Sequence, residues 1–410
     1  MGQAALKPEH MPLAEAKSVT FVEAGRPAAT VAAGERYEAL DALRGVAALM
    51  VVLFHCEILS HLNDWTLVRR GEAFVDFFFV LSGFVIARAY SGRLGSGTEL
   101  ARFALLRVGR VWPLHAVMLA LFVAVEIVKA FVPAFGAGGD PAFSGANAPS
   151  FILSNLLLVQ AFGLDGELSW NTPAWSISAE IAAYAVFAFI VFLGGRRWPL
   201  FMAATLALAL FVLAHDAEGM ATTARLGAAR AILGFAAGAL LAGATRGDRK
   251  ADAEPGNFVL ATMAELAAAT LVVLLAFVPE GDWRTFLAPA GFVIAVHVFA
   301  REGGALSALL RTRPFVALGG LSYGVYMVHM FINLRLLNVA SLADKAFAAG
   351  WRLPAGEGPA FAPKLDFGGA WAGDLATVAL IAFVIMAAAL AKRFVEDPGR
   401  RFARRMAARL

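Results

Sequence analysis

Arg44 and His55 lie eleven residues apart in one hydrophobic stretch, residues 40–56 with the sequence LDALRGVAALMVVLFHC. An α-helix turns by about 100° per residue, so eleven residues place two side chains within roughly 20° of one direction and about 16 Å apart along the axis. A guanidinium and an imidazole are costly in a lipid-spanning segment and normally face a protein interior or a water-filled cavity. The spacing predicts a site with an anion-binding group at one depth and a proton-transfer group at another. The alternative is that Arg44 only pairs with Asp41, three residues earlier on the same face.

The composition indicates a protein that crosses the membrane many times. Of the 410 residues, 60% are hydrophobic and only 16% are charged, compared with about 45–50% and about 25% in a soluble globular domain. Several apolar runs reach the length of roughly 20 residues that a helix needs to cross a bilayer. Cys56 is the only cysteine, which excludes an intramolecular disulfide and a cysteine-based metal cluster.

We predict an all-α fold, a polytopic membrane bundle of about ten transmembrane helices. The predicted spans lie near residues 40–60, 72–90, 111–134, 174–194, 198–214, 226–244, 258–278, 285–300, 316–338 and 373–395. The segment 151–163 is too short to span and is predicted to be interfacial or re-entrant.

The placement of basic residues predicts the orientation of the bundle. With the N-terminus inside, the tails and even-numbered loops hold roughly two thirds of the 35 Lys and Arg residues, whereas the long outer connection 135–173 holds none. The positive-inside rule therefore predicts that both termini are cytoplasmic. Residues 1–36 contain no uninterrupted apolar core, so we expect a flexible cytoplasmic tail and no cleavable signal peptide. A transmembrane domain is then expected at 37–395 and a basic cytoplasmic tail at 396–410.

Once the direction of each span is known, the position of a residue in the sequence gives its depth in the membrane, at about 1.5 Å per residue. On that scale, ionisable groups from four spans fall in one layer near the outer surface: His55, Asp76, Glu180 and His329. At the start of the third span, Arg107 and Arg110 join Arg44 in a cationic layer near the cytoplasmic surface. The sequence thus predicts a layer of proton-transfer groups near the outer surface and a layer of anion-binding arginines near the cytoplasmic surface.

Each of these groups also has a purely structural explanation. His55 could hydrogen-bond a neighbouring helix, and Asp76 and Glu180 could be polar contacts that hold helices together. Arg107 and Arg110 could be ordinary positive-inside anchors. Spacing alone does not choose between these explanations and a site.

Six short motifs occur in one order along the chain. They are Arg-x10-His at Arg44 and His55, VDxFFVLSGF at 75–84, Arg-x2-Arg-x2-Pro at Arg107, Arg110 and Pro113, Trp-Ser-x3-Glu-x3-Tyr at Trp175, Ser176, Glu180 and Tyr184, LGxxSYxxYxxH from Leu318 through Tyr323 and Tyr326 to His329, and Glu-x-Pro at Glu396 and Pro398. In these motifs the chain resembles the acyltransferase 3 family of integral membrane O-acyltransferases, from residue 37 onward. That family includes polysaccharide, peptidoglycan and nodulation-factor acetylases. Each motif alone is weak evidence, but six in order make a strong resemblance.

The resemblance implies a membrane O-acyltransferase of the bacterial inner membrane. Members of the family transfer an acyl group, usually acetyl, from cytoplasmic acyl-CoA to a hydroxyl of a glycan on the outer side of that membrane. The implied partners are acyl-CoA, the lipid bilayer and a glycan acceptor, which could be lipopolysaccharide, exopolysaccharide, peptidoglycan or an oligosaccharide. Neither a metal ion nor a nucleic acid is expected as a partner.

The resemblance also implies roles for individual residues. His55 is expected to be the general base, because an imidazole titrates near neutral pH and proton transfer of this kind contributes about 10²–10⁴-fold. Asp76 or Glu180 would hold the tautomer of His55 and stabilise the imidazolium. The expected contacts to the phosphates of coenzyme A are Arg44, Arg107 and Arg110, since a guanidinium stays charged and offers a planar fork of donors. The expected substrate-binding residues are Trp175, Tyr184, Tyr323 and His329.

Two other functions stay open at this point. A transporter or flippase would use the same intramembrane charges as a permeation path, although its usual sign, a pair of corresponding broken helices in two halves, is missing. The other is an acyltransferase acting on a lipid or a small molecule such as an antibiotic, which nothing in the sequence on the acceptor side excludes. The outer loop at 339–372 is long enough to be either functional or disordered, and it is a candidate for acceptor recognition.

Overall fold

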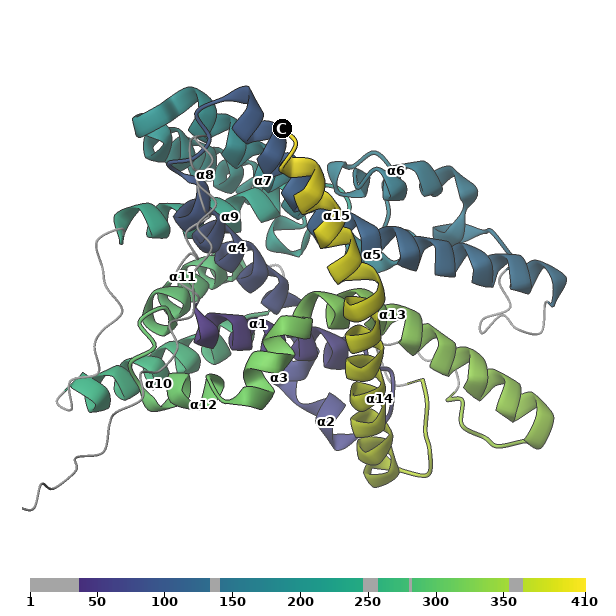
Figure 1. Ribbon diagram of the computed structural model, residues 1–410. Helices are drawn as coiled ribbons and strands as arrows, with labels where there is room; N and C mark the ends of the chain where they lie inside the picture. The colour runs from purple at the N-terminus through teal and green to yellow at the C-terminus, as the bar shows by residue number, and fades with distance from the viewer. Residues whose placement is uncertain (1–36, 133–140, 246–256, 280–281, 354–363) are drawn as a thin grey trace, which may run out of the picture. The chain divides into compact units, whose positions relative to one another are not determined.

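The all-α prediction is confirmed in the computed structural model, which describes residues 37–132, 141–245, 257–279, 282–353 and 364–410 (Figure 1). The structure is 80% helical and its described residues form no strand, only isolated bridges that Leu365 makes with Ile58 and Arg352. The predicted tail 1–36 lies outside the described residues. The described part of the fold is therefore a helical bundle.

Each of the ten predicted spans contains a helix. These helices are α1 (Glu38–Phe54), α4 (Phe74–Tyr90), α5 (Gly97–Phe131), α7 (Trp175–Gly194), α8 (Trp198–Ala214), α9 (Gly227–Ala244), α10 (Asn257–Ala276), α11 (Ala288–Phe299), α13 (Arg313–Phe347) and α14 (Ala370–Ala391). The shorter helices are α2 (His61–Asp64), α3 (Thr66–Arg69), α6 (Ile152–Leu156), α12 (Ala305–Leu310) and α15 (Asp397–Ala407). Single 3-10 turns lie at Gly71–Ala73, Gly145–Asn147, Pro149–Phe151, Gln160–Phe162, Thr172–Ala174, Gly195–Arg197, Gly219–Ala221 and Trp283–Leu287.

Among the described residues, seven helical segments are long and apolar enough to cross a membrane. The number is lower than the predicted ten because two spans are joined in one segment and two helices are shorter than predicted. Residues 172–214 form one helical segment that holds two predicted spans, α1 has only 17 residues, and α11 has only 12. The protein is therefore a polytopic membrane protein, as its composition predicted.

Glycines bring the helices that carry the site into close contact. A Cβ added to Gly83 of α4 would lie 2.0 Å from the carbonyl oxygen of Phe235 in α9, and one added to Gly238 of α9 would lie 1.9 Å from that of Val80. On α13, a Cβ at Gly319 would lie 2.2 Å from the carbonyl oxygen of Asp41 in α1. Small residues at such crossings let helix backbones approach in the way that membrane bundles favour.

One helix end near the site differs from the predicted one. The first predicted span runs to residue 60, but α1 ends at Phe54 and His55 is its C-terminal cap. The helix ends there because a short loop to Ser60 follows, in which Glu57 pairs with the chain at 364–365. His55 therefore lies at the end of its helix and not inside it.

The C-terminal region is also more ordered than a tail. Residues predicted as a basic tail from 396 form α15, which follows α14 through a π-helical turn at Lys392–Glu396 (Figure 1). Helix α15 packs against α5 through Ala403 and Ala407, whose side chains are buried. A Cβ added to Gly109 of α5 would lie 2.2 Å from the Cβ of Ala403, so this contact is close.

Candidate active site

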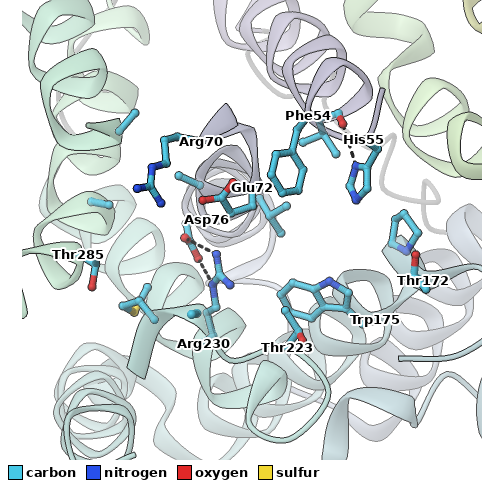
Figure 2. Close-up of a pocket in the computed structure, with 18 of the residues that line it drawn as sticks. Phe54, His55, Arg70, Glu72, Asp76, Thr172, Trp175, Thr223, Arg230 and Thr285 are labelled. Atoms are coloured by element: carbon cyan, nitrogen blue, oxygen red, sulfur yellow. Dashed lines mark hydrogen bonds and ion pairs between the residues drawn. The ribbon is translucent and has the colours of Figure 1, made fainter. Parts of the chain in front are cut away.

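Two cavities lie among α1, α4, α7 and α13, and nine of the ten predicted site residues line one or the other. We call the first, of about 400 Å³, the histidine cavity; its predicted site residues are His55, Asp76 and Trp175 (Figure 2). We call the second, of about 100 Å³, the arginine cavity; its predicted site residues are Arg44, Arg107, Arg110, Glu180, Tyr184 and Tyr323. The bundle thus places Arg44, Arg107 and Arg110 in a different cavity from His55, as the spacing in α1 predicted, whereas Arg70 and Arg230 line the histidine cavity.

The hydrogen bonds around His55 define which of its ring nitrogens carries the proton. Nδ1 of His329 lies 2.6 Å from the carbonyl oxygen of Tyr326, so this nitrogen is the donor and Nε2 of His329 is an acceptor. Nδ1 of His55 lies 2.9 Å from the carbonyl oxygen of Val51 and 3.3 Å from Nε2 of His329. Because both neighbours are acceptors, Nδ1 of His55 carries its proton and the basic lone pair is on Nε2.

The structure replaces the predicted tautomer-holding carboxylate with a backbone carbonyl and a second imidazole. Val51, one turn before His55, and His329 of α13 are the partners of Nδ1. Asn333 adds a hydrogen bond from its side-chain amide to the carbonyl oxygen of His55, at 3.0 Å. This arrangement follows from the end of α1 at Phe54, which brings the His55 ring against α13.

Asp76, one of the two predicted carboxylates, forms a buried ion pair with Arg230 of α9 (Figure 2). Nε of Arg230 donates to one carboxylate oxygen at 2.8 Å and its terminal nitrogen donates to the other at 2.9 Å. Arg230 also donates to the carbonyl oxygen of Thr222 and stacks over the ring of Trp175, 5.5 Å from its centroid. The pair lies in the wall of the same cavity as His55.

Arg230 was missed by the sequence analysis, although a signal for it exists. It is the only charged residue in α9, which is otherwise built of Ala, Leu, Gly, Ile and Phe. A lone guanidinium in such a segment is costly unless a protein partner neutralises it. The signal predicts a buried acidic partner, but sequence alone does not say which carboxylate it is.

Three arginine side chains line the arginine cavity, and the described residues accept hydrogen bonds from only some of their N–H groups. Nε of Arg44 donates to Ser322 at 3.0 Å and its terminal nitrogen donates to Asp41 at 2.9 Å. The pairing with Asp41 is therefore real, yet Arg44 also lines the cavity. Arg107 donates to the hydroxyl of Tyr90 at 3.2 Å, and its buried Nε makes no hydrogen bond to the described residues. Arg110 lines the same wall.

Glu180 lies in the arginine cavity and not in the predicted layer with His55. One of its carboxylate oxygens accepts hydrogen bonds from the hydroxyl of Ser82 at 2.6 Å and from that of Tyr184 at 2.5 Å. The depth estimate was wrong because α1 ends at Phe54 and not near residue 60, so His55 lies at the end of its helix. Glu180 lies five residues, or about 7.5 Å, beyond the start of α7 at Trp175.

The four predicted substrate-binding residues do not form one group in the structure. Trp175 lines the histidine cavity, whereas Tyr184 and Tyr323 line the arginine cavity, where the hydroxyl of Tyr323 donates to the carbonyl oxygen of Val111 at 2.5 Å. His329 is fully buried and lines neither cavity, but it contacts His55 and Tyr326, which both line the histidine cavity. Its position is that of a residue supporting His55.

Part of the predicted outer loop 339–372 joins the chain directly after His55. Helix α13 continues to Phe347, and residues 354–363 lie outside the described residues. Nζ of Lys364 lies 2.7 Å from a carboxylate oxygen of Glu57, and backbone hydrogen bonds link both Lys364 and Leu365 to the carbonyl oxygen of Glu57. Burial raises the pKa of the Glu57 carboxyl, while the charge of Lys364 opposes that shift.

The fold and the site together define a helical membrane bundle with His55 in one cavity and Arg44, Arg107 and Arg110 in the adjoining one. Residues 37–339 match the acyltransferase domain that defines the acyltransferase 3 family, and the chain belongs to this family. The protein is therefore a membrane acyltransferase.

The chain is also similar to two known proteins, one of which is named an acyltransferase. The chain is 34% identical to "Protein 2 in picA locus" of Rhizobium radiobacter over 164 residues, which cover 38% of this chain and 82% of that protein. It is 29% identical to "Acyltransferase MdmB" of Streptomyces mycarofaciens over 161 residues, or 37% of this chain and 38% of that protein. The match to MdmB thus spans well under half the length of that acyltransferase. No solved structure matches the chain.

Proposed function

We propose that this protein transfers an acyl group, in the simplest case acetyl, from acyl-CoA in the arginine cavity to a hydroxyl group in the histidine cavity. The observation that carries the proposal is the adjacency of these two cavities, one lined by Arg44, Arg107 and Arg110 and the other by His55. Guanidinium groups suit the phosphates of coenzyme A because each presents a fixed fork of donors. A neutral imidazole suits proton abstraction from a hydroxyl at neutral pH.

The proposed reaction is a direct transfer between the two substrates. The acceptor oxygen attacks the thioester carbonyl carbon, a C–O bond forms, and the C–S bond breaks. The hydroxyl proton moves to Nε2 of His55, which then gives it to the departing thiolate of coenzyme A. The Nδ1–H donor of His55 stays hydrogen-bonded throughout, and this fixes the ring for both proton transfers.

The proposed acceptor is a glycan outside the inner membrane, with acyl-CoA supplied from the cytoplasm. Lipopolysaccharide, exopolysaccharide, peptidoglycan and oligosaccharides all present hydroxyl groups for this chemistry. Both termini are then cytoplasmic, and the arginine cavity opens to the cytoplasmic side. The basic residues of the tails and even-numbered loops support this orientation.

A lipid or small-molecule acceptor is the second candidate, and the lining of the histidine cavity favours it. Most of that lining is apolar and includes Val51, Phe54, Leu168, Met220, Leu275 and Met330. Ligand sites of this kind hold an apolar body and fix its orientation through a few polar groups. An acceptor with one hydroxyl on an apolar framework would fit these walls.

Comparative mass spectrometry of cells with and without the gene tests the proposal. Envelope glycans and organic extracts are analysed from the deletion strain, the complemented strain and a strain complemented with the His55→Ala variant. An acyl ester found only with the active gene identifies the acceptor class by the fraction in which it occurs. An unchanged set of acyl esters in every fraction would refute an acyltransferase reaction on these molecules.

A further inference from the structure

Four helices, α1, α4, α7 and α13, contribute side chains to both cavities. Two residues, Val75 of α4 and Tyr326 of α13, line both cavities. On either side of them the two linings separate: Asp76, Trp175 and Met330 belong to the histidine cavity, and Ser82, Ile177 and Ser322 to the arginine cavity. Val75 and Tyr326 therefore form the wall that the two cavities share.

Tyr326 is held rigidly in this wall. Its hydroxyl donates to the carbonyl oxygen of Pro173 at 3.0 Å and lies 2.8 Å from Oγ of Ser176. Pro173 belongs to the 3-10 turn Thr172–Ala174 and Ser176 to the first turn of α7. Its ring packs edge to face on Phe78 of α4, with 5.8 Å between ring centroids, and only 5% of the residue is exposed. Its backbone oxygen accepts the hydrogen bond of His329. Contacts to two other helices thus leave the phenol little freedom to move.

We propose that Val75 and Tyr326 select short acyl chains by limiting the space in which the thioester meets His55. This inference rests on the proposed function, in which the acyl group reaches His55 from the arginine cavity. Val75 and Tyr326 are the two residues that both linings have in common, so an acyl group that extends from the arginine cavity toward His55 is placed against Val75 and the Tyr326 ring. A rigid apolar wall discriminates by size, and one methylene group in such a pocket changes specificity by about 10–200-fold.

The test measures how acyl length changes affinity in the purified full-length protein. Isothermal titration calorimetry in detergent gives Kd values for coenzyme A, acetyl-CoA and butyryl-CoA. The variants are Tyr326→Ala and the milder Val75→Ala, and their matched controls are Tyr326→Phe, which keeps the ring, and Val80→Ala. Val80 is equally buried on α4 but packs toward α9 and lines neither cavity.

We expect the wild-type protein to bind butyryl-CoA at least about tenfold more weakly than acetyl-CoA. Tyr326→Ala and Val75→Ala should each reduce that ratio about tenfold, because removing side-chain volume makes room for the added carbons. The ratio should not change in Tyr326→Phe or Val80→Ala. Size selection by this wall is overturned if the ratio is the same in all five proteins while coenzyme A still binds. Failure of the wild-type protein to bind coenzyme A would overturn the donor assignment itself.

Discussion

At the scale of single residues, His55 gains its proposed chemistry from the groups that hold its ring. A backbone carbonyl one turn earlier and the fully buried His329 both contact Nδ1. Neutral acceptors at Nδ1 leave Nε2 as the basic nitrogen without placing a carboxylate next to it. The imidazole can thus accept and return a proton in a cavity whose lining is mostly apolar.

Replacing His55 should abolish acyl transfer without preventing insertion. A general base contributes about 10²–10⁴-fold, so His55→Ala should retain under about one hundredth of wild-type activity at equal protein accumulation. His329→Ala should lose less, because it removes one of two acceptors at Nδ1 and leaves Val51 in place. Transfer of radiolabel from acyl-CoA to the acceptor fraction measures both. Activity of His55→Ala above about a tenth of wild type would remove His55 from the base role.

Arg44 should contribute to acyl-CoA affinity through the shape of its guanidinium as well as its charge. Arg44→Lys keeps the charge but loses the fork of donors, so we expect weaker binding of coenzyme A. Binding should be weaker still in Arg44→Ala. Calorimetric Kd values in detergent provide the comparison. Unchanged affinity in both variants would leave the hydrogen bonds to Asp41 and Ser322 as the whole role of Arg44.

At the scale of helices, α4 and α9 form a unit that supports the histidine cavity. Gly83 and Gly238 allow the two backbones to touch, and the ion pair between Asp76 and Arg230 joins them at the cavity wall. Both side chains of the pair are about 4% exposed. Removing one partner of a buried pair leaves an uncompensated charge, which is far more costly than removing both.

The ion pair between Asp76 and Arg230 should show this asymmetry. Asp76→Leu or Arg230→Met alone should destabilise the protein by about 3–5 kcal/mol, whereas the double variant should recover most of that loss. We expect the double variant to stay poorly active, because both charges line the cavity of His55. Thermal melting in detergent and the radiolabel assay separate these effects. If the double variant recovered activity as well as stability, the role of Asp76 would be structural only.

At the scale of the whole molecule, the function depends on which end of the bundle faces the cytoplasm. The two cavities lie toward opposite ends of α1, with Arg44 near its start and His55 at its end. Donor and acceptor can therefore be supplied from opposite sides of the membrane. This division requires the arginine end to face the compartment that contains acyl-CoA.

Single cysteines test this orientation directly. In a Cys56→Ser background, cysteines at the exposed positions Ser150 and Ala408 should differ in their reaction with a membrane-impermeant thiol reagent. The charge distribution predicts labelling of Ser150→Cys in intact spheroplasts and of Ala408→Cys only after permeabilisation. The reverse labelling pattern would place the arginines on the side without acyl-CoA. It would refute a cytoplasmic donor even though the family assignment would stand.

The sequence alone was sufficient for the fold class, the approximate spans and the family. These depend on local properties: runs of apolar residues long enough for a bilayer, and short motifs at fixed spacing. The separation of Arg44 from His55 was also predictable, because both lie on one helix of known pitch. The lone charge of Arg230 in α9 was available in the sequence as a sign of a buried pair.

Only the tertiary structure decided which side chains meet. Asp76 pairs with Arg230 instead of His55, Glu180 lies with the arginines, and Tyr326 stands between the two cavities. Such partnerships depend on where each helix begins and ends and on how closely its neighbours pack. A shift of a few residues in a helix end moves a side chain by several ångströms, which is enough to exchange one partner for another. Pairing across helices was therefore a property of the packed bundle, whereas the groups to be paired were already present in the sequence.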